Sequence, residues 1–313
     1  MTPAMLFAPL QLLLLLVVSP LVGGVIKTLK ARLQTRRGPG ILQPYRDLNK
    51  LFGKGMVIPQ SASWIFDAAP VVVFAVTAVV GLMVPMITAE APMSLFGGVL
   101  AVVYLLGLAR FFLALSGLDT GSSFGGLGSS REMTISALAE PAMMLAIFTV
   151  ALSAHSTNLS EIARSAIGQS WRFLAPSQML AFAALFIVLI AETGRIPVDN
   201  PATHLELTMI HEAMVLEYSG PYLALIEWGA WMKQLILMML LANAFYPFGL
   251  AIDASPAGIV FACVTLLAKL LLLSILIVLV ETANAKMRLF RVPELLAVAF
   301  ILGALALIST FLF

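Results

Sequence analysis

Residues 256–281, PAGIVFACVTLLAKLLLLSILIVLVE, contain no charged side chains apart from Lys269 and Glu281. A run of roughly 20 apolar residues is long enough to cross the hydrocarbon core of a bilayer as an α-helix. The whole chain is 61% hydrophobic and 11% charged, with a mean hydropathy of +1.02. Soluble domains are about half apolar and about a quarter charged. The composition therefore indicates a membrane protein.

Similar apolar runs recur along the chain and predict an all-α membrane protein with about eight transmembrane helices in one bundle. The first run is too long for a secretory signal and lacks a basic leading region and a small-residue cleavage site, so it is expected to stay in the mature protein. No polar linker, charge block or low-complexity tract separates a second domain, which makes 1–313 one polytopic domain. The predicted spans are 4–26, 66–88, 95–116, 133–154, 178–194, 223–247, 256–281 and 293–313.

Basic side chains are concentrated in two connections, one after the first span (27–64) and one after the seventh. The intervening outer loops hold only Arg164 and Arg172. Because basic loops face the cytoplasm, both connections are predicted to be cytoplasmic. An even number of spans then places both termini outside and the acidic and histidine-containing loop 195–222 inside. The basic residues are Lys27, Lys30, Arg32, Arg36, Arg37, Arg46, Lys50, Lys54, Lys286, Arg288 and Arg291.

Two connections have distinctive patterns. Residues 41–54, ILQPYRDLNKLFGK, place apolar residues at helical spacing and predict an amphipathic helix at the membrane interface. An ordinary connecting helix packed on the bundle is equally compatible with this pattern. Residues 118–132, LDTGSSFGGLGSSRE, have neither a GxxxxGK[ST] motif nor a preceding strand, which argues against a phosphate loop. They predict a compact loop covered by a partner surface.

Several ionisable residues fall inside the predicted spans. A charge near the bilayer centre costs about 2.5–3.5 kcal/mol on insertion scales, so such residues usually face a polar cavity or a partner. A chain of carboxylates and amines in these surroundings can carry protons near neutral pH. For Glu192 and Glu281, which lie near the ends of their spans, simple contact with the interface is the alternative. The residues singled out are Arg110, Glu140, Glu192, Lys233, Lys269 and Glu281.

Residues 204–217, HLELTMIHEAMVLE, concentrate titratable groups in an otherwise apolar chain. As a helix this segment would place both histidines on one face and would have no clean apolar stripe, which suits a crevice between the bundle and another subunit. The HExxH zinc motif fails because Val215 occupies the second histidine position. No metal site or hydrolase site is therefore expected. The titratable residues are His204, Glu206, His211, Glu212 and Glu217.

The chain has a single cysteine, Cys263, and it lies within a predicted span. Iron–sulfur clusters and nickel–iron centres draw on several cysteine ligands. The chain is therefore expected to hold no redox centre or other cofactor of its own, and another chain would carry the electrons. The two halves also lack matching broken helices, which disfavours a self-contained transporter.

Three motifs give the chain a specific resemblance over nearly its whole length. They are RRGPGILQPYRDLNKLF (36–52), ARFFLALSGLDTGSSFGGLGSSRE (109–132) and ETGRIPVDNPATHLELTMIHEAMVLEYSGP (192–221). The chain resembles the membrane-anchor subunit of group 4 nickel–iron hydrogenases, the type that includes the hydrogenase-4 C subunit and formate hydrogenlyase subunit 4. That family is related to subunit 1 of respiratory complex I.

The resemblance implies a non-catalytic subunit in a bacterial or archaeal cytoplasmic membrane. Its partners would be a hydrogenase-type large subunit, a small iron–sulfur subunit, antiporter-like membrane subunits and lipid, with no nucleic acid. The nickel–iron centre and the iron–sulfur clusters would lie on the partner subunits. The subunit would anchor the hydrophilic redox arm and couple electron transfer to proton or sodium movement.

Most residue roles follow from the same resemblance. The resemblance assigns the coupling path to Glu140, Glu192, Asp199, Glu206, Glu212 and Glu217. Lys269 and Glu281 are added to this path because they are charges inside predicted spans. His204 and His211 are expected to be proton relays or ordinary loop hydrogen-bonding groups. Loop ordering and docking are assigned to Arg195 and Pro197 of the RxPxD motif and to Arg36 and Arg37.

Two alternatives remain at this point. Complex I subunit 1 usually has a more acidic sequence after RxPxD, whereas two histidines follow here, which favours the hydrogenase branch over a quinone-pocket subunit of an NADH dehydrogenase-like complex. A free-standing ion transporter is the third hypothesis.

Overall fold

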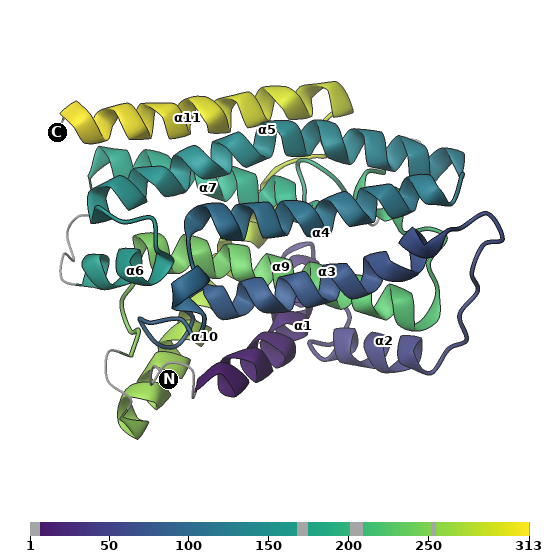
Figure 1. Cartoon of the computed structure of the whole chain (residues 1–313), viewed down its shortest axis with the longest axis horizontal. Helices are drawn as coiled ribbons and strands as arrows, with labels where there is room; N and C mark the ends of the chain where they lie inside the picture. The colour runs from purple at the N-terminus through teal and green to yellow at the C-terminus, as the bar shows by residue number, and fades with distance from the viewer. Residues whose placement is uncertain (1–6, 168–174, 201–208, 252–254, 313) are drawn as a thin grey trace.

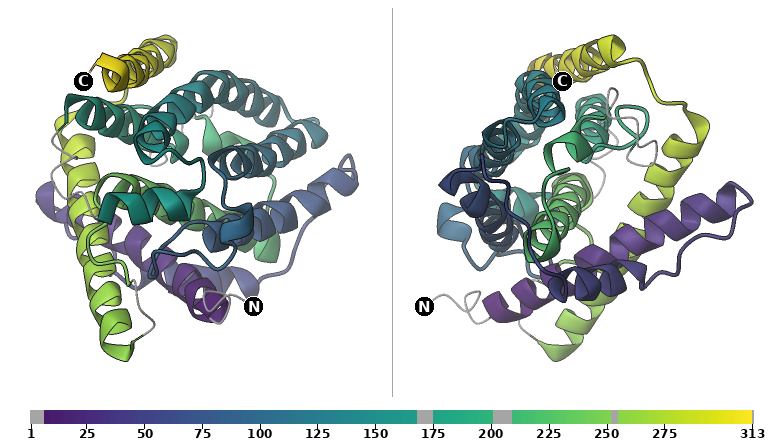
Figure 2. Two further views of the ribbon diagram at one scale, coloured as in Figure 1. Left: turned by 60° about the vertical axis from the view of Figure 1, so that its left-hand side comes forward. Right: turned by 90° about the vertical axis from the view of Figure 1, so that its right-hand side faces the viewer.

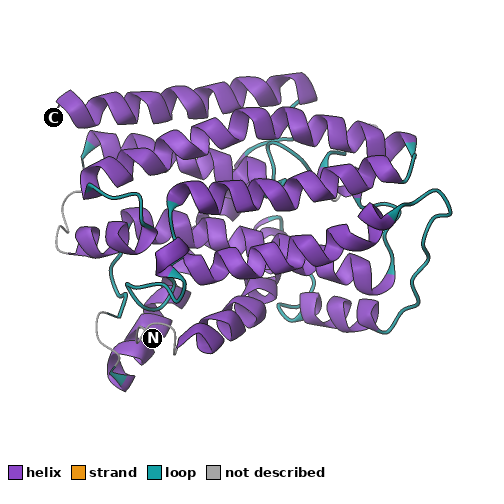
Figure 3. Ribbon diagram, in the orientation of Figure 1, coloured by secondary structure: helices purple, strands orange, loops and turns teal. Residues whose placement is uncertain are grey.

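The computed structural model describes residues 7–167, 175–200, 209–251 and 255–312 (Figure 1). Within these ranges the chain is built from helices joined by turns and loops (Figure 3). The helices are α1 Ala8–Leu33, α2 Gln43–Phe52, α3 Trp64–Met83, η2 Ser94–Phe96, α4 Val99–Asp119, α5 Ser123–Ala154, α6 Leu159–Ile167, α7 Pro176–Glu192, α8 His211–Met214, α9 Gly220–Phe245, α10 Pro256–Ala283, η4 Leu289–Arg291 and α11 Val292–Leu312.

Seven of the described helical segments are long and apolar enough to cross a membrane: α1, α3, α4, α5, α9, α10 and the run formed by η4 and α11. Helix α7 is apolar but shorter. Together they confirm the prediction of an all-α membrane protein with about eight spanning helices. Several starts are fixed by serine caps, whose hydroxyl oxygen accepts a backbone N–H of the first turn. Ser122 accepts from Gly125 and Ser255 accepts from Gly258, both at 3.1 Å.

Helix α1 differs from its predicted span, 4–26, by continuing to Leu33. Its last turns carry Lys30 and Arg32, so a composition-based boundary ends the span too early. The helix is anchored at its other end by Gln11, whose side-chain amide donates to the carbonyl oxygens of Gly81 (2.7 Å) and Val84 (2.8 Å) at the end of α3. The basic side chains at the end of α1 therefore extend from a continuous helix rather than from a loop.

The helices pack into one bundle in which α10 and α11 lie on different sides (Figures 1 and 2). Helix α11 packs on α5 and α7, α3 packs between α4 and α9, and α1 contacts both α9 and α10. The core between them is formed by buried apolar side chains, among which Leu15, Met143, Leu185 and Leu189 are fully buried. The segment between α10 and α11 must consequently cross from one side of the bundle to the other.

The prediction of a compact loop at 118–132 is wrong. Helix α4 continues to Asp119 and α5 begins at Ser123, so most of this segment is helical. The glycines allow close helix packing: a side-chain carbon at Gly125 would overlap the backbone of Gly117. A side-chain carbon at Gly128 would lie 2.8 Å from the Ala213 Cβ and 3.0 Å from the Ile210 carbonyl oxygen. The glycines are therefore contact surfaces of helices, and Gly128 seats α8 against α5.

The predicted helix at 41–54 is observed as α2, Gln43–Phe52. It packs on α9 and α1. Leu48 is buried, whereas Lys50 is exposed. The Tyr45 hydroxyl donates to the Val17 carbonyl oxygen, and the Phe52 and Trp228 rings meet edge to face with centroids 6.3 Å apart. Helix α2 is thus attached to the bundle, as one of the two alternatives expected.

Candidate functional site: a cavity bordered by buried ion pairs

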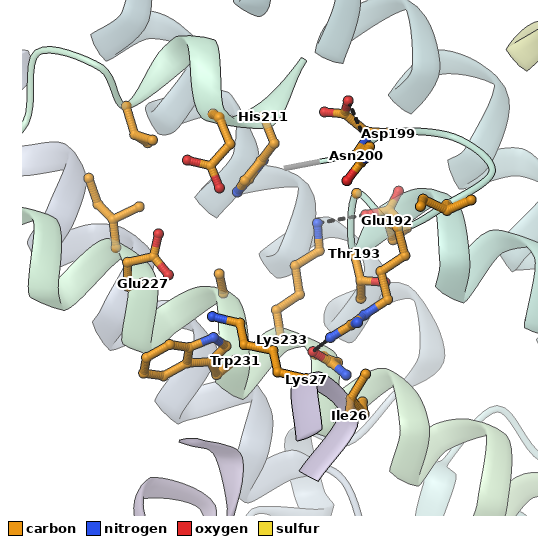
Figure 4. Close-up of a pocket in the computed structure, with 18 of the residues that line it drawn as sticks. Ile26, Lys27, Glu192, Thr193, Asp199, Asn200, His211, Glu227, Trp231 and Lys233 are labelled. Atoms are coloured by element: carbon orange, nitrogen blue, oxygen red, sulfur yellow. Dashed lines mark hydrogen bonds and ion pairs between the residues drawn. The ribbon is translucent and has the colours of Figure 1, made fainter. Parts of the chain in front are cut away.

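A cavity of about 530 Å³ lies inside the bundle. Its walls come from α1, α3, α4, α5, α7, α8, α9 and α10 and from the loop after α7. Figure 4 shows the side chains of Lys27, His211, Glu227 and Lys233 around this space. Arg36 and Arg37, from the segment after α1, also line it. Chain segments that are far apart in sequence therefore bring both signs of charge to one cavity.

Arg110 of α4 is the centre of the first buried charge cluster. It is 5% exposed and donates to the Ser136 hydroxyl and to Glu140 Oε1 of α5, the latter at 2.6 Å. It also pairs with Glu192 at the end of α7, and its Nε lies 3.6 Å from Glu132 Oε1. The predicted residues Glu140 and Glu192 are thus brought together by an arginine that joins three helices.

Lys233 of α9 extends this cluster. Its Nζ lies 2.7 Å from Glu192 Oε2, the same carboxylate that binds Arg110 (Figure 4). Glu192 is 7% exposed, so this buried carboxylate contacts two cations, one of which it shares with Glu140 and Glu132. A buried charge is costly unless it is paired in this way. Glu192 is therefore buried among cations of the bundle rather than on its outer surface.

Glu281 of α10 is the centre of a second cluster. Its two carboxylate oxygens lie 2.8 Å from Arg195 Nη1 and 2.7 Å from Lys30 Nζ. Arg195 also donates through Nη2 to Gln234 Oε1 at 2.7 Å. Glu281 is 4% exposed, so it too is buried inside the bundle. This cluster joins α1, α9, α10 and the loop after α7.

Asp199, the last residue of the RxPxD motif, ties that loop to two other segments. It is 2% exposed. Lys286 Nζ lies 2.8 Å from its Oδ1, and the Ile210 amide donates to its Oδ2 at 3.1 Å. The Met287 amide donates to the carbonyl oxygen of Pro197 at 2.8 Å, and Pro197 follows a cis peptide bond. The loop is thus fixed to the segment between α10 and α11 and to the start of α8.

The other predicted site residues are distributed differently. His211 and Glu212 line the cavity, whereas Glu217 is exposed and does not line it. Lys269 lies on α10 away from the cavity. His204 and Glu206 lie outside the described residues. The part of 204–217 that the structure describes forms the short helix α8 and the turns after it, with Ala213 and Met214 buried against α5 and α4.

Several cavity residues were missed by the site predictions. Glu227 and Trp231 of α9 and Lys27 of α1 line the cavity, and Lys27 Nζ lies 5.9 Å from the centroid of the Trp231 ring. Glu227 could have been found, because it falls inside the predicted span 223–247. Over the described ranges, no three His, Cys, Asp or Glu side chains gather in a way that could hold a metal ion. The cavity wall thus gathers carboxylates and amines, the kinds of side chain that can gain or lose a proton.

We expect Arg195→Ala to loosen the loop after α7. The change removes the bonds to Glu281 and Gln234 and leaves Glu281 with Lys30 as its remaining cation. The measurement is hydrogen exchange of residues 195–200 in the detergent-solubilised protein, which should accelerate. Arg164→Ala is the control, because Arg164 pairs with Glu90 at a more exposed site. Unchanged exchange at 195–200 would exclude a loop-ordering role for Arg195.

The chain is similar to known membrane proteins over nearly its whole length. The NADH dehydrogenase family matches residues 6–312. The chain is 37% identical over 301 residues to hydrogenase-4 component C of Escherichia coli (strain K12), covering 96% of this chain and 94% of that one. It is 34% identical over 306 residues to formate hydrogenlyase subunit 4 of the same organism, with 98% of each chain covered.

More distant matches extend to respiratory complexes. The H subunit of the NADH-quinone oxidoreductase of Syntrophotalea carbinolica (strain DSM 2380 / NBRC 103641 / GraBd1) is 31% identical over 266 residues, with 75% of this chain and 78% of that one covered. A solved structure entitled "Structure of the membrane-bound sulfane sulfur reductase (MBS), an archaeal respiratory membrane complex" aligns with a TM-score of 0.84 and 21% identity, covering 97% of this chain and 98% of that one. This structural match supports the fold.

The bundle and its buried ion pairs define a multi-pass α-helical membrane protein with an ionisable interior. The chain belongs to the NADH dehydrogenase family, which includes subunit 1 of complex I. Its similarity to the hydrogenase-4 and formate hydrogenlyase subunits extends over nearly all of its length, as the sequence motifs predicted.

Proposed function

We propose that this chain is the membrane anchor of a group 4 hydrogenase-type oxidoreductase complex and couples electron transfer in a hydrophilic arm to proton or sodium movement. The large hydrogenase subunit and a small iron–sulfur subunit would hold the nickel–iron centre and the clusters, and antiporter-like subunits would adjoin in the membrane. The complex would lie in a bacterial or archaeal cytoplasmic membrane, with both termini of this chain outside. Full-length similarity to hydrogenase-4 component C and formate hydrogenlyase subunit 4 supports this branch.

The observation that carries the coupling role is the placement of Glu192. Its carboxylate is buried between Arg110 and Lys233 at the wall of the cavity. Glu140 shares the same arginine from α5. A proton added to either carboxylate would change the ion pairs of Arg110. The protonation of these carboxylates is therefore linked to the contacts that join α4, α5, α7 and α9. A redox event that alters the charge in the cavity can thereby change the ion-pair contacts of several helices.

Glu140→Gln is expected to weaken coupling while the complex still assembles. Glutamine keeps the shape of the side chain and an oxygen that can accept from Arg110, but it cannot take up a proton. In proteoliposomes that contain the assembled complex, ion movement per hydrogen formed should fall severalfold while hydrogen formation is retained. Glu192→Gln should have the same effect and also lower stability, since Glu192 pairs with both Arg110 and Lys233.

Glu90→Gln is the matched control for this experiment. Glu90 is also an ion-paired glutamate, but its partner Arg164 is exposed and lies outside the cavity. Its coupling ratio should equal that of the unaltered complex. An unchanged ratio in assembled Glu140→Gln and Glu192→Gln complexes would exclude both residues from the coupling path.

The anchoring role has a separate test. The complex that copurifies with this chain should contain a large subunit with paired CxxC motifs together with nickel and iron. Purification of the chain as a single transporting polypeptide would overturn the proposal in favour of a free-standing transporter.

A quinone-pocket role is the second candidate, and the cavity favours it. Its volume of about 530 Å³ falls within the range of about 300–1,000 Å³ typical of small-molecule sites. A photoreactive quinone added to the complex would then label cavity residues near Trp231. Absence of this labelling at quinone concentrations that saturate a known quinone-reducing complex would exclude this candidate.

A further inference from the structure

Lys269 lies at the midpoint of α10 and is held by a neutral partner. Its Nζ donates to Asn243 Oδ1 of α9 at 2.8 Å. The amide nitrogen of Asn243 donates to the Pro85 carbonyl oxygen at 2.7 Å, which orients the amide oxygen toward the lysine. None of the carboxylates in the described part of the chain forms an ion pair with Lys269. The Lys269 ammonium group is thus oriented by Asn243, but no carboxylate in the described part of the chain neutralises its charge.

The face of α10 beside this lysine is exposed. In the 18-residue apolar stretch of α10, 33% of the residues are buried, whereas 61% are buried in the corresponding stretch of α9. The helix packs mainly on α1 and has few contacts with α9. Leu272 is 69% exposed and Val264 is 60% exposed. At 100° per residue, Lys269 falls at the edge between this exposed face and the buried face.

Contact with lipid alone would leave the Lys269 ammonium group in unfavourable apolar surroundings. An ammonium group in the middle of a spanning helix is costly, and such groups face a polar cavity or pair with an opposite charge. Lys269 does not line the cavity. It lies near the midpoint of the span, several helical turns from either end, so its side chain is poorly placed to reach the interface. A carboxylate from outside the chain would complete the site.

We propose that the exposed face of α10 docks a transmembrane helix of another membrane subunit, and that an Asp or Glu near the middle of that helix pairs with Lys269. A second copy of this chain does not fit, because a symmetric α10 contact would bring two Lys269 side chains together. The only carboxylate within α10, Glu281, is already paired with Lys30 and Arg195. This inference rests on the proposed function insofar as it requires assembly with other membrane subunits.

Zero-length cross-linking tests the contact directly. The intact complex is treated with dicyclohexylcarbodiimide, which enters the membrane and activates carboxyl groups, and peptides that contain Lys269 are identified by mass spectrometry. The expected product is an amide bond between Lys269 Nζ and an Asp or Glu in a spanning helix of another chain. It should disappear in Lys269→Met. The inference is overturned if Lys269 is recovered unmodified or linked only within this chain.

Subunit retention provides a second readout. In Lys269→Met the partner membrane subunit should be lost during detergent washing at least about tenfold faster, because its buried carboxylate has lost its cation. Lys269→Arg, which keeps the charge, should restore retention. Lys50→Met, the same chemical change at an exposed lysine of α2, is the control. Equal retention of all membrane subunits in Lys269→Met and Lys50→Met would also count against the inference.

The outcomes separate this inference from the proposed function. A complex that retains its nickel–iron arm but shows no Lys269 cross-link to another chain refutes only the docking of α10. A chain that purifies without any hydrogenase-type subunit refutes the proposed function itself.

Discussion

Replacement of Arg110 with methionine is expected to destabilise the bundle more than any other single substitution of a charged side chain in this chain. Arg110 is the shared cation of Glu132, Glu140 and Glu192. Its removal leaves these carboxylates around an uncharged side chain. Breaking a buried ion pair by removing one partner costs about 3–5 kcal/mol. The measurement is thermal unfolding of the detergent-solubilised complex, followed by tryptophan fluorescence.

Two comparisons isolate the charge of Arg110 from its volume. Arg110→Lys keeps the positive charge and should recover part of the lost stability, although an ammonium group cannot reproduce the forked contacts of a guanidinium group. Arg164→Met removes an arginine whose side chain is 54% exposed, and should cost at most about 1 kcal/mol. Equal unfolding temperatures for Arg110→Met and Arg164→Met would show that the buried cluster contributes little to stability.

Gly128→Leu is expected to displace α8 from α5. The nearest atoms to a new Cβ at Gly128 are the Ala213 Cβ, the Ile210 carbonyl oxygen and the Met214 amide nitrogen at 2.8–3.1 Å. Two of these are backbone atoms, which cannot rotate away. Overpacking of this kind costs about 1–3 kcal/mol. Because α8 carries His211, we expect the unfolding temperature to fall and the cavity wall to move.

Gly126→Leu is the matched control for this prediction. Gly126 lies on the same helix two residues earlier, and the nearest atom to a new Cβ there is Leu118 Cδ2 at 4.0 Å. A glycine-to-leucine change at this position should leave stability unchanged or raise it by about 0.5–1 kcal/mol through higher helix propensity. Hydrogen exchange of residues 209–215 should rise in Gly128→Leu alone. Similar exchange in both variants would contradict close packing at Gly128.

The spanning helices could be predicted because each depends on a local property, a run of apolar side chains. The run at 256–281 corresponds to α10, Pro256–Ala283, and the run at 133–154 lies within α5. The loop prediction at 118–132 was wrong because glycine is common both in turns and where helices pack closely. Helix α6, Leu159–Ile167, was not predicted at all, because its short amphipathic sequence follows neither the span pattern nor a loop pattern.

The site was only partly predictable for a different reason. Ionisable residues such as Glu192 and Glu281 were identifiable as costly charges in an apolar sequence. Their partners were not, because pairing depends on which helices are neighbours. Glu192 binds a residue of α4 and a residue of α9, and Glu281 binds a residue of α1 and one of the loop after α7. These contacts join positions that are distant in sequence, and no local pattern encodes them.

The attachment of the loop after α7 to the segment between α10 and α11 has a mechanical consequence. The two are joined by the Lys286–Asp199 ion pair and by the hydrogen bond from Met287 to Pro197. That segment links two helices, α10 and α11, that lie on different sides of the bundle (Figure 2). A bound protein that pulled on the loop would therefore place the segment under tension, and the tension would reach both helices at once.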